Sequence, residues 1–305
     1  MENIDAIRLN FDKDSLFLLN LCLAIIMFGI ALEIKVSDFK NLLQKPGPAI
    51  IGLLSQFVVL PLLTFLLILA LKPHPSIALG MILVAACPGG NISNFMSHLA
   101  NANAALSVGL TSVSTFLSLL MTPLNFKLYG SLYEPTAELL TSIELDFWSV
   151  TKVVVLIIFL PLVTGLIVQF KLATIAKKVA PFFRYSSILI FIAFVVIAFS
   201  KNLNFFVNYI HLVIGLVFLH NLLALLTGYS VASLAGLANR DRRTLAIETG
   251  IQNSGLGLVL IFTFFEGLGG MAMVAAWWGI WHIISGLSLA AYWSRRAPSK
   301  EGLKA

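Results

Sequence analysis

Nine apolar runs, separated by short polar segments, dominate the sequence. A transmembrane helix needs about 20 mostly apolar residues, and each run is close to that length. The runs lie at about 16–32, 48–69, 77–99, 104–129, 150–169, 181–199, 206–234, 244–265 and 270–293. The segments between them are too short for a separate water-soluble domain. We therefore predict an all-α membrane protein in which residues 1–305 form a single transmembrane domain of nine helices.

The composition excludes the common classes of soluble protein. Of the 305 residues, 59% are hydrophobic and 11% are charged, whereas soluble domains carry about 25% charged residues. A cytosolic enzyme, a protein that binds nucleic acid and a disordered chain are therefore excluded, and membrane lipid is the expected surrounding. The two cysteines, Cys22 and Cys87, lie inside apolar runs, so we expect neither a disulfide framework nor a cysteine metal site.

The basic residues predict the orientation of the chain in the membrane. Nine crossings place the two termini on opposite sides. Of the 20 lysines and arginines, six fall on the side of the N-terminus: Arg8, Lys13, Lys72, Lys127, Lys152 and Lys201. The other fourteen fall on the opposite side. Because basic residues concentrate in cytoplasmic loops, we predict that the N-terminus is outside and the C-terminus is cytoplasmic.

Two of the nine runs are interrupted by polar and turn-forming residues. Residues 87–94 read Cys-Pro-Gly-Gly-Asn-Ile-Ser-Asn, and residues 248–255 read Glu-Thr-Gly-Ile-Gln-Asn-Ser-Gly. Proline and glycine favour unwinding of a helix, and unwound backbone survives at membrane depth only inside protein or beside a polar cavity. The breaks lie five runs apart, which predicts an inverted repeat whose first helix is missing. Such paired breaks indicate the substrate and ion site of a secondary transporter; the alternative is two simple kinks in packed helices.

Glu248 is the only carboxylate deep within any apolar run. Inserting such a group costs about 2.5–3.5 kcal/mol on translocon scales, so a partner must offset that cost. Its sequence neighbours are amides and hydroxyls rather than bases, and oxygen donors suit a hard cation such as Na⁺. Two alternatives stay open: Glu248 carries a proton for coupling, or it is a protonated acid that only donates a hydrogen bond.

A few other polar residues lie at membrane depth. Ser107 and Thr111 are four residues apart and therefore share one helix face, although such hydroxyls often bond to their own helix. Gln56 stands alone in its run, which is more typical of a contact between helices. His282 either faces an anionic substrate or is a packed neutral side chain.

At these residues the sequence resembles the bile acid:sodium symporter family, from about residue 19 to residue 293. The matching stretches are 26–32, Gln56 and Phe57 with Pro61, 87–94, 106–115, 247–256, and Trp281 and His282 with Ser285 and Gly286. The resemblance implies a panel domain and a core domain, with a substrate cavity between them and the two broken helices crossing at the ion site. The panel comprises 16–32, 150–169 and 181–199, and the core comprises 48–129 and 206–293.

The resemblance also implies two sodium ions that share one acid. The first ion would be held by Ser93, Asn94, Ser107, Thr111 and Glu248. The second would be held by the side chains of Gln56, Glu248 and Gln252 and by the backbone carbonyls of Thr249 and Ile251.

The function that the resemblance implies is sodium-coupled symport of an organic anion by alternating access, in the inner (plasma) membrane of a bacterium. The substrate would be bile acid-like or a small carboxylate, and its contacts would be Asn91, Ile92, Asn253, Ser254 and His282. A helix start near Asn91 offers free amides and a positive dipole end, which favour a carboxylate.

Other functions are disfavoured by the residues. A proton-coupled transporter is the main alternative. A channel is disfavoured because paired breaks indicate an occluding site rather than a continuous pore. A membrane enzyme is disfavoured because the runs contain no paired acids, no nucleophile and base at a suitable spacing, and no cluster of metal ligands.

Overall fold

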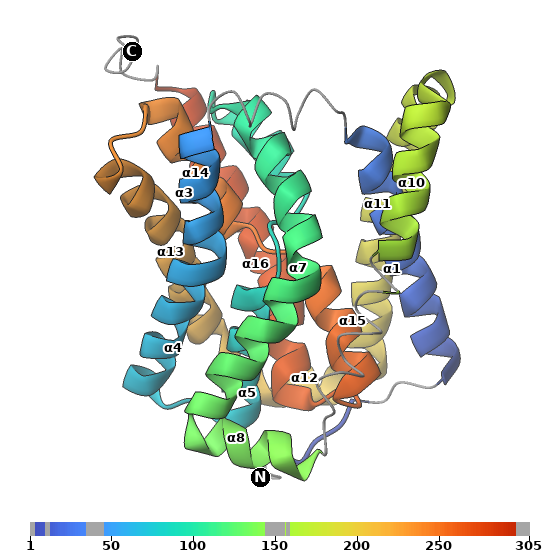
Figure 1. Cartoon of the computed structure of the whole chain (residues 1–305). Helices are drawn as coiled ribbons and strands as arrows, with labels where there is room; N and C mark the ends of the chain where they lie inside the picture. Colours follow the sequence, from blue (N-terminus) through green and yellow to red (C-terminus); the bar gives the residue numbers. More distant parts are fainter. Residues whose placement is uncertain (1–3, 10–12, 35–45, 144–155, 157–158, 297–305) are drawn as a thin grey trace.

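The computed structural model describes residues 4–9, 13–34, 46–143, 156 and 159–296. All regular secondary structure in this part of the chain is helical (Figure 1). The helices are α1 (Lys13–Glu33), α3 (Pro46–Leu54), the π-helix η1 (Ser55–Val59), α4 (Leu60–Leu71), α5 (Pro75–Ala86), α6 (Ile92–Leu99), α7 (Ala104–Leu132), α8 (Glu134–Ser142), α10 (Leu160–Lys171), α11 (Ala173–Lys201), α12 (Leu203–Tyr209), α13 (His211–Leu234), α14 (Asn239–Gly250), α15 (Ser254–Phe264) and α16 (Gly269–Ser294). The prediction of an all-α fold is confirmed for these residues.

Four helical segments are long and apolar enough to cross a membrane: Pro46–Leu71, Ala104–Leu132, His211–Leu234 and Gly269–Ser294. Shorter apolar helices occupy Asn20–Gly29, Pro75–Ala86, Leu160–Lys171 and Ser254–Phe264. Two of the shorter helices, α5 and α15, are short because the predicted breaks interrupt the third and eighth runs. The start of the fifth predicted run, at 150–155 and 157–158, lies outside the described residues.

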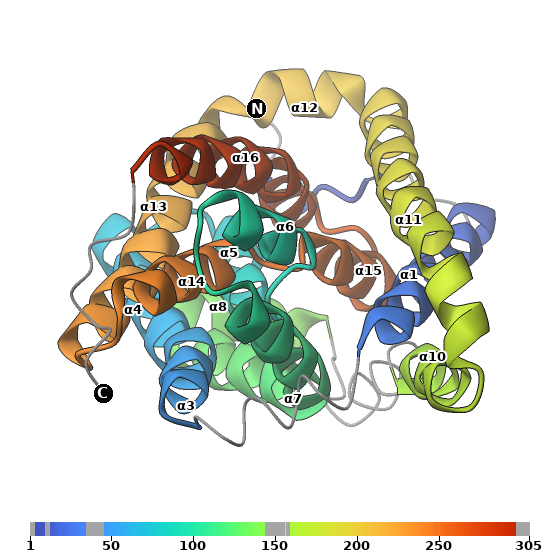
Figure 2. The ribbon, with the colours of Figure 1, turned by 90° about the horizontal axis from the view of Figure 1, so that it is seen from above.

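Helix α5 lies at the centre of the larger group of helices. Every residue from Ser76 to Ala86 is buried, and α16 and α7 pack along it. Figure 2 shows α5 and α6 enclosed by α7, α13, α14 and α16. A helix that is apolar on all sides is typical of such a central position. Its C-terminal end at Ala86 therefore places the first break inside the protein.

Helices α1, α10 and α11 form a second, smaller group at one side of the molecule (Figures 1 and 2). Leu32 of α1 is buried against Ala176 and Ala180 of α11. The rings of Phe28 and Phe183 meet edge to face, with their centroids 5.1 Å apart. Helix α1 also contacts α15, so this group lies beside the second half of the eighth run.

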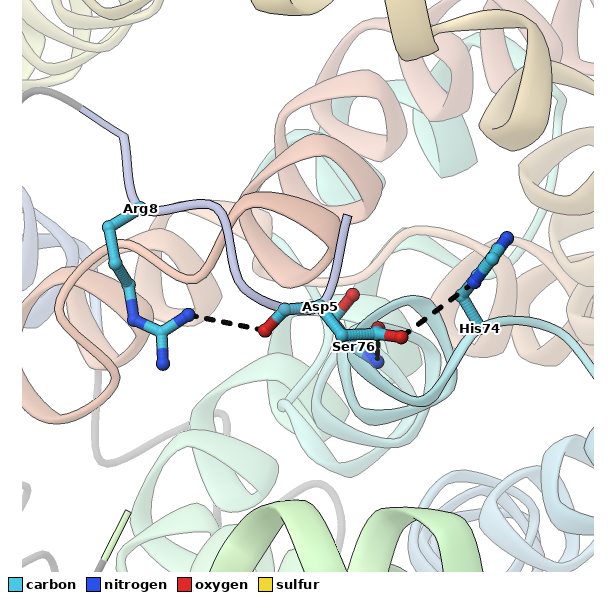
Figure 3. Close-up of polar contacts among 4 residues, drawn as sticks. All are labelled: Asp5, Arg8, His74 and Ser76. Carbon is cyan, nitrogen blue, oxygen red and sulfur yellow. Dashed lines mark hydrogen bonds and ion pairs between the residues drawn. The ribbon is translucent and has the colours of Figure 1, made fainter. Parts of the chain in front are cut away.

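The N-terminal segment 4–9 crosses the ends of α5 and α16 (Figure 3). Leu9 N donates to Gly267 O over 2.9 Å, and Gly269 N donates to Ile7 O over 2.9 Å. The Asp5 carboxylate accepts a 2.8 Å hydrogen bond from Ser76 N in the first turn of α5. A carboxylate there satisfies a free backbone amide and complements the positive end of the helix dipole.

Candidate ion and substrate site

The two breaks cross each other and pair through their backbones. Gly90 N donates to Ile251 O over 2.7 Å, and Asn253 N donates to Pro88 O over 2.9 Å. The approach is close enough that a Cβ at Gly90 would lie 3.1 Å from Gln252 O. Each break therefore satisfies backbone groups of the other, which removes the cost of unwound backbone at membrane depth. The structure brings together two segments that are 163 residues apart (89 to 252).

Side chains from neighbouring helices satisfy the carbonyls at the end of α5. Thr122 Oγ1 of α7 donates to Ala86 O over 2.7 Å, and Gln56 Nε2 donates to Cys87 O over 2.9 Å. These carbonyls have no partner within α5, because the helix stops before Pro88. Gln56 thus lies at the first break.

Glu248 lies beside the crossing, near the end of α14, and is 5% exposed. Its Oε1 accepts hydrogen bonds from the hydroxyls of Ser93 and Ser107. Its Oε2 accepts a 3.0 Å hydrogen bond from Thr111 Oγ1. Among the residues that the structure describes, no lysine, arginine or histidine forms an ion pair with it. The carboxylate is therefore surrounded by hydroxyl donors, which favour its charged form.

Asn94 completes this cluster. Its Oδ1 lies 2.9 Å from Ser107 Oγ and 3.2 Å from Thr111 Oγ1. Each of these hydroxyls has one proton, so it donates either to Asn94 or to Glu248 at any one time. Ser93 and Asn94 belong to the first turn of α6, and Ser107 and Thr111 lie one turn apart on α7. The five residues predicted for the first ion therefore lie together. Their donor atoms are all oxygens, which is the chemistry that a hard cation requires.

The residues predicted for the second ion also lie at the crossing. Gln56 Nε2 donates to Gln252 Oε1 over 2.7 Å, and Gln252 Nε2 donates to Thr249 O over 2.6 Å. The Ile251 carbonyl accepts from Gly90 N. A carbonyl oxygen has two lone pairs, so the carbonyls of Thr249 and Ile251 each keep one that is free to face a cation.

Gln56 is presented by the π-helix η1, which the sequence pattern did not predict. Pro61 has no N–H, so the carbonyl of Phe57 lacks its usual helical partner. Asn125 Nδ2 of α7 donates to that carbonyl over 2.9 Å. π-helical turns are frequent at functional sites. The position of Gln56 in its apolar run predicted a contact between helices, and the resemblance implied an ion ligand; its amide contacts both breaks.

The predicted substrate residues lie mainly at the starts of the second half-helices. Asn91 and Ile92 begin α6, and Ser254 begins α15. Asn253 caps α15, because its Oδ1 accepts a 3.0 Å hydrogen bond from Leu256 N. His282 comes from α16; it is 5% exposed, and its Nδ1 has no hydrogen-bond partner among the described residues. In the same part of the chain, no hydrogen bond joins His282 to the other four.

Three polar residues at the crossing were missed by the sequence reasoning. Ser55 Oγ lies 3.0 Å from Thr249 Oγ1, Asn125 bonds to η1, and Asn221 Nδ2 of α13 donates to Gly250 O over 2.8 Å. The signal for the two asparagines was available, since each is an isolated amide in an apolar run. Their partners are backbone carbonyls, which a sequence does not reveal.

A model of the sodium bile acid symporter family matches residues 20–209, more than half of the chain. The sodium-dependent transporter YocS of Bacillus subtilis is 35% identical over 298 residues, which cover 96% of this chain and 89% of YocS. The probable chloroplastic sodium/metabolite cotransporter BASS1 of Arabidopsis thaliana is 30% identical over 91% of this chain and 67% of its own length. The human sodium/bile acid cotransporter 4 is 30% identical over 76% of this chain and 52% of its own.

These comparisons confirm the resemblance that the break motifs suggested. The second break, at 248–255, lies beyond the region matched by the family model, but the match to YocS extends over 96% of this chain. The family and these relatives are transporters rather than enzymes. The chain is therefore an integral membrane protein that belongs to the sodium bile acid symporter family of sodium-dependent transporters.

Proposed function

We propose that the protein is a sodium-coupled symporter of an organic anion. The observation that carries the proposal is the buried Glu248 carboxylate, which accepts hydrogen bonds from Ser93, Ser107 and Thr111. Three donors favour an ionised acid, and no basic side chain of the described chain neutralises it. A cation is the partner that remains, and Na⁺ agrees with the family.

Two ions would share this acid. The first would be held by the cluster of Glu248 with Asn94 and the three hydroxyls. The second would be held by the side chains of Gln56, Glu248 and Gln252 and by the carbonyls of Thr249 and Ile251. Both sets consist of oxygen atoms, and both draw residues from more than one helix. Bound ions would therefore hold α6, α7, η1 and α14 together.

The substrate would bind at the starts of α6 and α15, where free amides and positive dipole ends favour an anion. Asn91, Ile92, Asn253, Ser254 and His282 are the proposed contacts. The names of the relatives, a sodium/metabolite cotransporter and a sodium/bile acid cotransporter, support either a small carboxylate or a larger anion. Because ions and substrate would stabilise the same crossing, each would strengthen the binding of the other.

Transport would proceed by alternating access, with α1, α10 and α11 as the panel and the helices of residues 48–129 and 206–293 as the core. The proposed topology has nine crossings in a bacterial inner membrane, with the N-terminus outside. Several of the basic residues that support this orientation lie outside the described residues: Lys35, Lys40, Lys45, Lys152, Lys300 and Lys304. Helix α1 contacts α15, so movement of the panel would act directly on the half-helix that starts at the proposed substrate site.

A panel of organic anions tests this function. The melting temperature Tm of the purified protein is measured with each anion in Na⁺ and in choline at fixed pH. A substrate is expected to raise Tm in Na⁺ and to have little effect in choline, because linkage requires ion and anion to bind together. Equal stabilisation in both salts, with a dependence on pH, would instead support proton coupling through Glu248.

A further inference from the structure

The ends of α5 and α14 are anchored in the same way. In the backbone pairing of the breaks, Gly89 faces Gln252, 163 residues later in the sequence (252 minus 89). If the two halves of the chain correspond with this offset of 163 residues, Cys87 at the end of α5 corresponds to Gly250 at the end of α14. The Cys87 carbonyl accepts from an amide of η1, in the second run. The Gly250 carbonyl accepts from the amide of Asn221, in the seventh run. The carbonyl at the end of each first half-helix, α5 or α14, therefore accepts a hydrogen bond from a side-chain amide of the preceding apolar run.

The Asn221 amide that bonds to the end of α14 is itself held by a second hydrogen bond. Ser285 Oγ of α16 donates to Asn221 Oδ1 over 2.6 Å, which fixes which end of the amide faces Gly250. At the same offset, Ser285 corresponds to Thr122, whose hydroxyl donates to Ala86 O at the end of α5. Asn221 is fully buried. A buried amide whose oxygen and nitrogen both have partners has a single well-defined orientation.

Helix α13, which carries Asn221, packs tightly against α14. A Cβ at Gly250 would lie 2.7 Å from Cγ of Leu225, and a Cβ at Gly228 would collide with the carbonyl of Leu245. Small residues at such contacts let helices approach closely. This approach brings the Asn221 amide within hydrogen-bond distance of the α14 backbone, one turn of α13 before Leu225.

In the sequence, the Gly250 carbonyl lies between the carbonyls of Thr249 and Ile251, which are the two backbone groups proposed as sodium ligands. Ile251 N donates to Ile247 O over 2.9 Å, so the peptide group that joins Gly250 to Ile251 is held at both its N–H and its C=O. Glycine itself restrains the backbone least of all residues. The hydrogen bond from Asn221 therefore restrains the backbone at Gly250, which glycine itself does not, and it fixes the direction of the backbone at the end of α14.

We propose that Asn221, oriented by Ser285, is a positioning residue for sodium: it holds the Gly250 carbonyl and thereby directs the carbonyls of Thr249 and Ile251 toward the second ion. This inference rests on the sodium coordination proposed above. Asn221 itself does not touch the ion. Its loss should weaken sodium binding without abolishing it.

The experiment titrates Na⁺ alone into the purified full-length protein, with choline chloride keeping the ionic strength constant. The apparent Kd for Na⁺ is obtained from the dependence of Tm on Na⁺ concentration. Asn221→Ala is expected to raise this Kd by roughly five- to tenfold, the effect of one buried hydrogen bond. Ser285→Ala should raise it by a smaller factor, and the double variant should be no worse than Asn221→Ala, because both act through one contact.

Thr227→Ala is the matched control. Thr227 is buried on the same helix as Asn221, but its hydroxyl donates only to Leu223 O of its own helix, so the Kd should stay at the wild-type value. A Kd within twofold of wild type in both Asn221→Ala and Ser285→Ala would overturn the inference, even if Tm fell at every Na⁺ concentration. Ser285→Ala, which removes a single hydroxyl, decides the matter if Asn221→Ala does not fold. A wild-type Tm that does not change with Na⁺ concentration would overturn the proposed function as well.

Discussion

Glu248 is stabilised by hydroxyls from two helices that are distant in sequence from α14. The three donors, Ser93, Ser107 and Thr111, lie between 137 and 155 residues before it. A buried carboxylate without such donors is expected to be protonated. The hydroxyls therefore do more than fill space, because their hydrogen bonds oppose the effect of burial and favour the charged form, which attracts a cation.

Replacing Thr111 with valine tests this at a single position. Thr111→Val keeps the shape of the side chain but removes the donor to Glu248 Oε2, so we expect the apparent Kd for Na⁺ to rise by about tenfold. Thr115→Val is the control, since Thr115 is buried on the same helix but donates only to Thr111 O. Titration of Tm with Na⁺ measures both variants. Equal Kd values for the two would show that the Thr111 hydroxyl has no special role.

At the scale of elements, the sequence predicted where helices break better than how the breaks are held. Pro88 and the glycines are local signals: α5 ends at Ala86, directly before the first predicted break, and α14 ends at Gly250, inside the second. The π-helix around Gln56 was not predicted, because it depends on a carbonyl that Asn125 satisfies from another helix. Hydrogen bonds between distant segments leave no local pattern.

The N-terminal segment is an element whose role the apolar runs did not indicate. Asp5 caps α5 through Ser76 N, and its other oxygen lies 3.7 Å from Nδ1 of His74, a side chain that is 52% exposed. The cap is the stronger contact, because an exposed ion pair contributes little. Segment 4–9 therefore stabilises the start of α5 mainly through the hydrogen bond to Ser76.

We expect Asp5→Ala to destabilise the fold by about 1–2 kcal/mol, the usual effect of losing an N-cap. His74→Ala removes only the exposed pair and should change stability by less than about 0.5 kcal/mol. Thermal unfolding in detergent at neutral pH compares the two variants with the wild type. A larger loss in His74→Ala than in Asp5→Ala would contradict this ranking.

At the scale of the whole molecule, the lengths of the apolar runs predicted where helices form. They did not predict how the helices are grouped, because the grouping depends on tertiary packing. In the described part of the chain, the four helical segments that are long and apolar enough to cross a membrane and the shorter apolar helices overlap predicted runs, and the count of nine crossings stays a prediction. The separation of α1, α10 and α11 from the other helices follows from packing, such as Leu32 against Ala176, which periodicity alone does not specify. The five residues of the first predicted ion site lie together, and their binding of sodium stays a prediction.

The proposed orientation in the membrane can be tested with single cysteines. Cys22 and Cys87 are free thiols and are first replaced by serine and alanine. Lys72→Cys, in the exposed turn between α4 and α5, should react with a membrane-impermeant maleimide in intact cells. Arg240→Cys, exposed near the start of α14, should react only after the cells are permeabilised. Labelling of Arg240→Cys in intact cells, with Lys72→Cys protected, would invert the topology.

The central claim is that Glu248 binds sodium at the crossing of the two broken helices. The most direct measurement is the Tm of wild-type and Glu248→Gln protein over a range of Na⁺ concentrations, with choline keeping the ionic strength constant. Glutamine keeps the size of the side chain but removes its charge. We expect Tm of the wild type to rise with Na⁺ and Tm of folded Glu248→Gln to stay flat. A rise in Glu248→Gln with the same apparent Kd as in the wild type would contradict the claim.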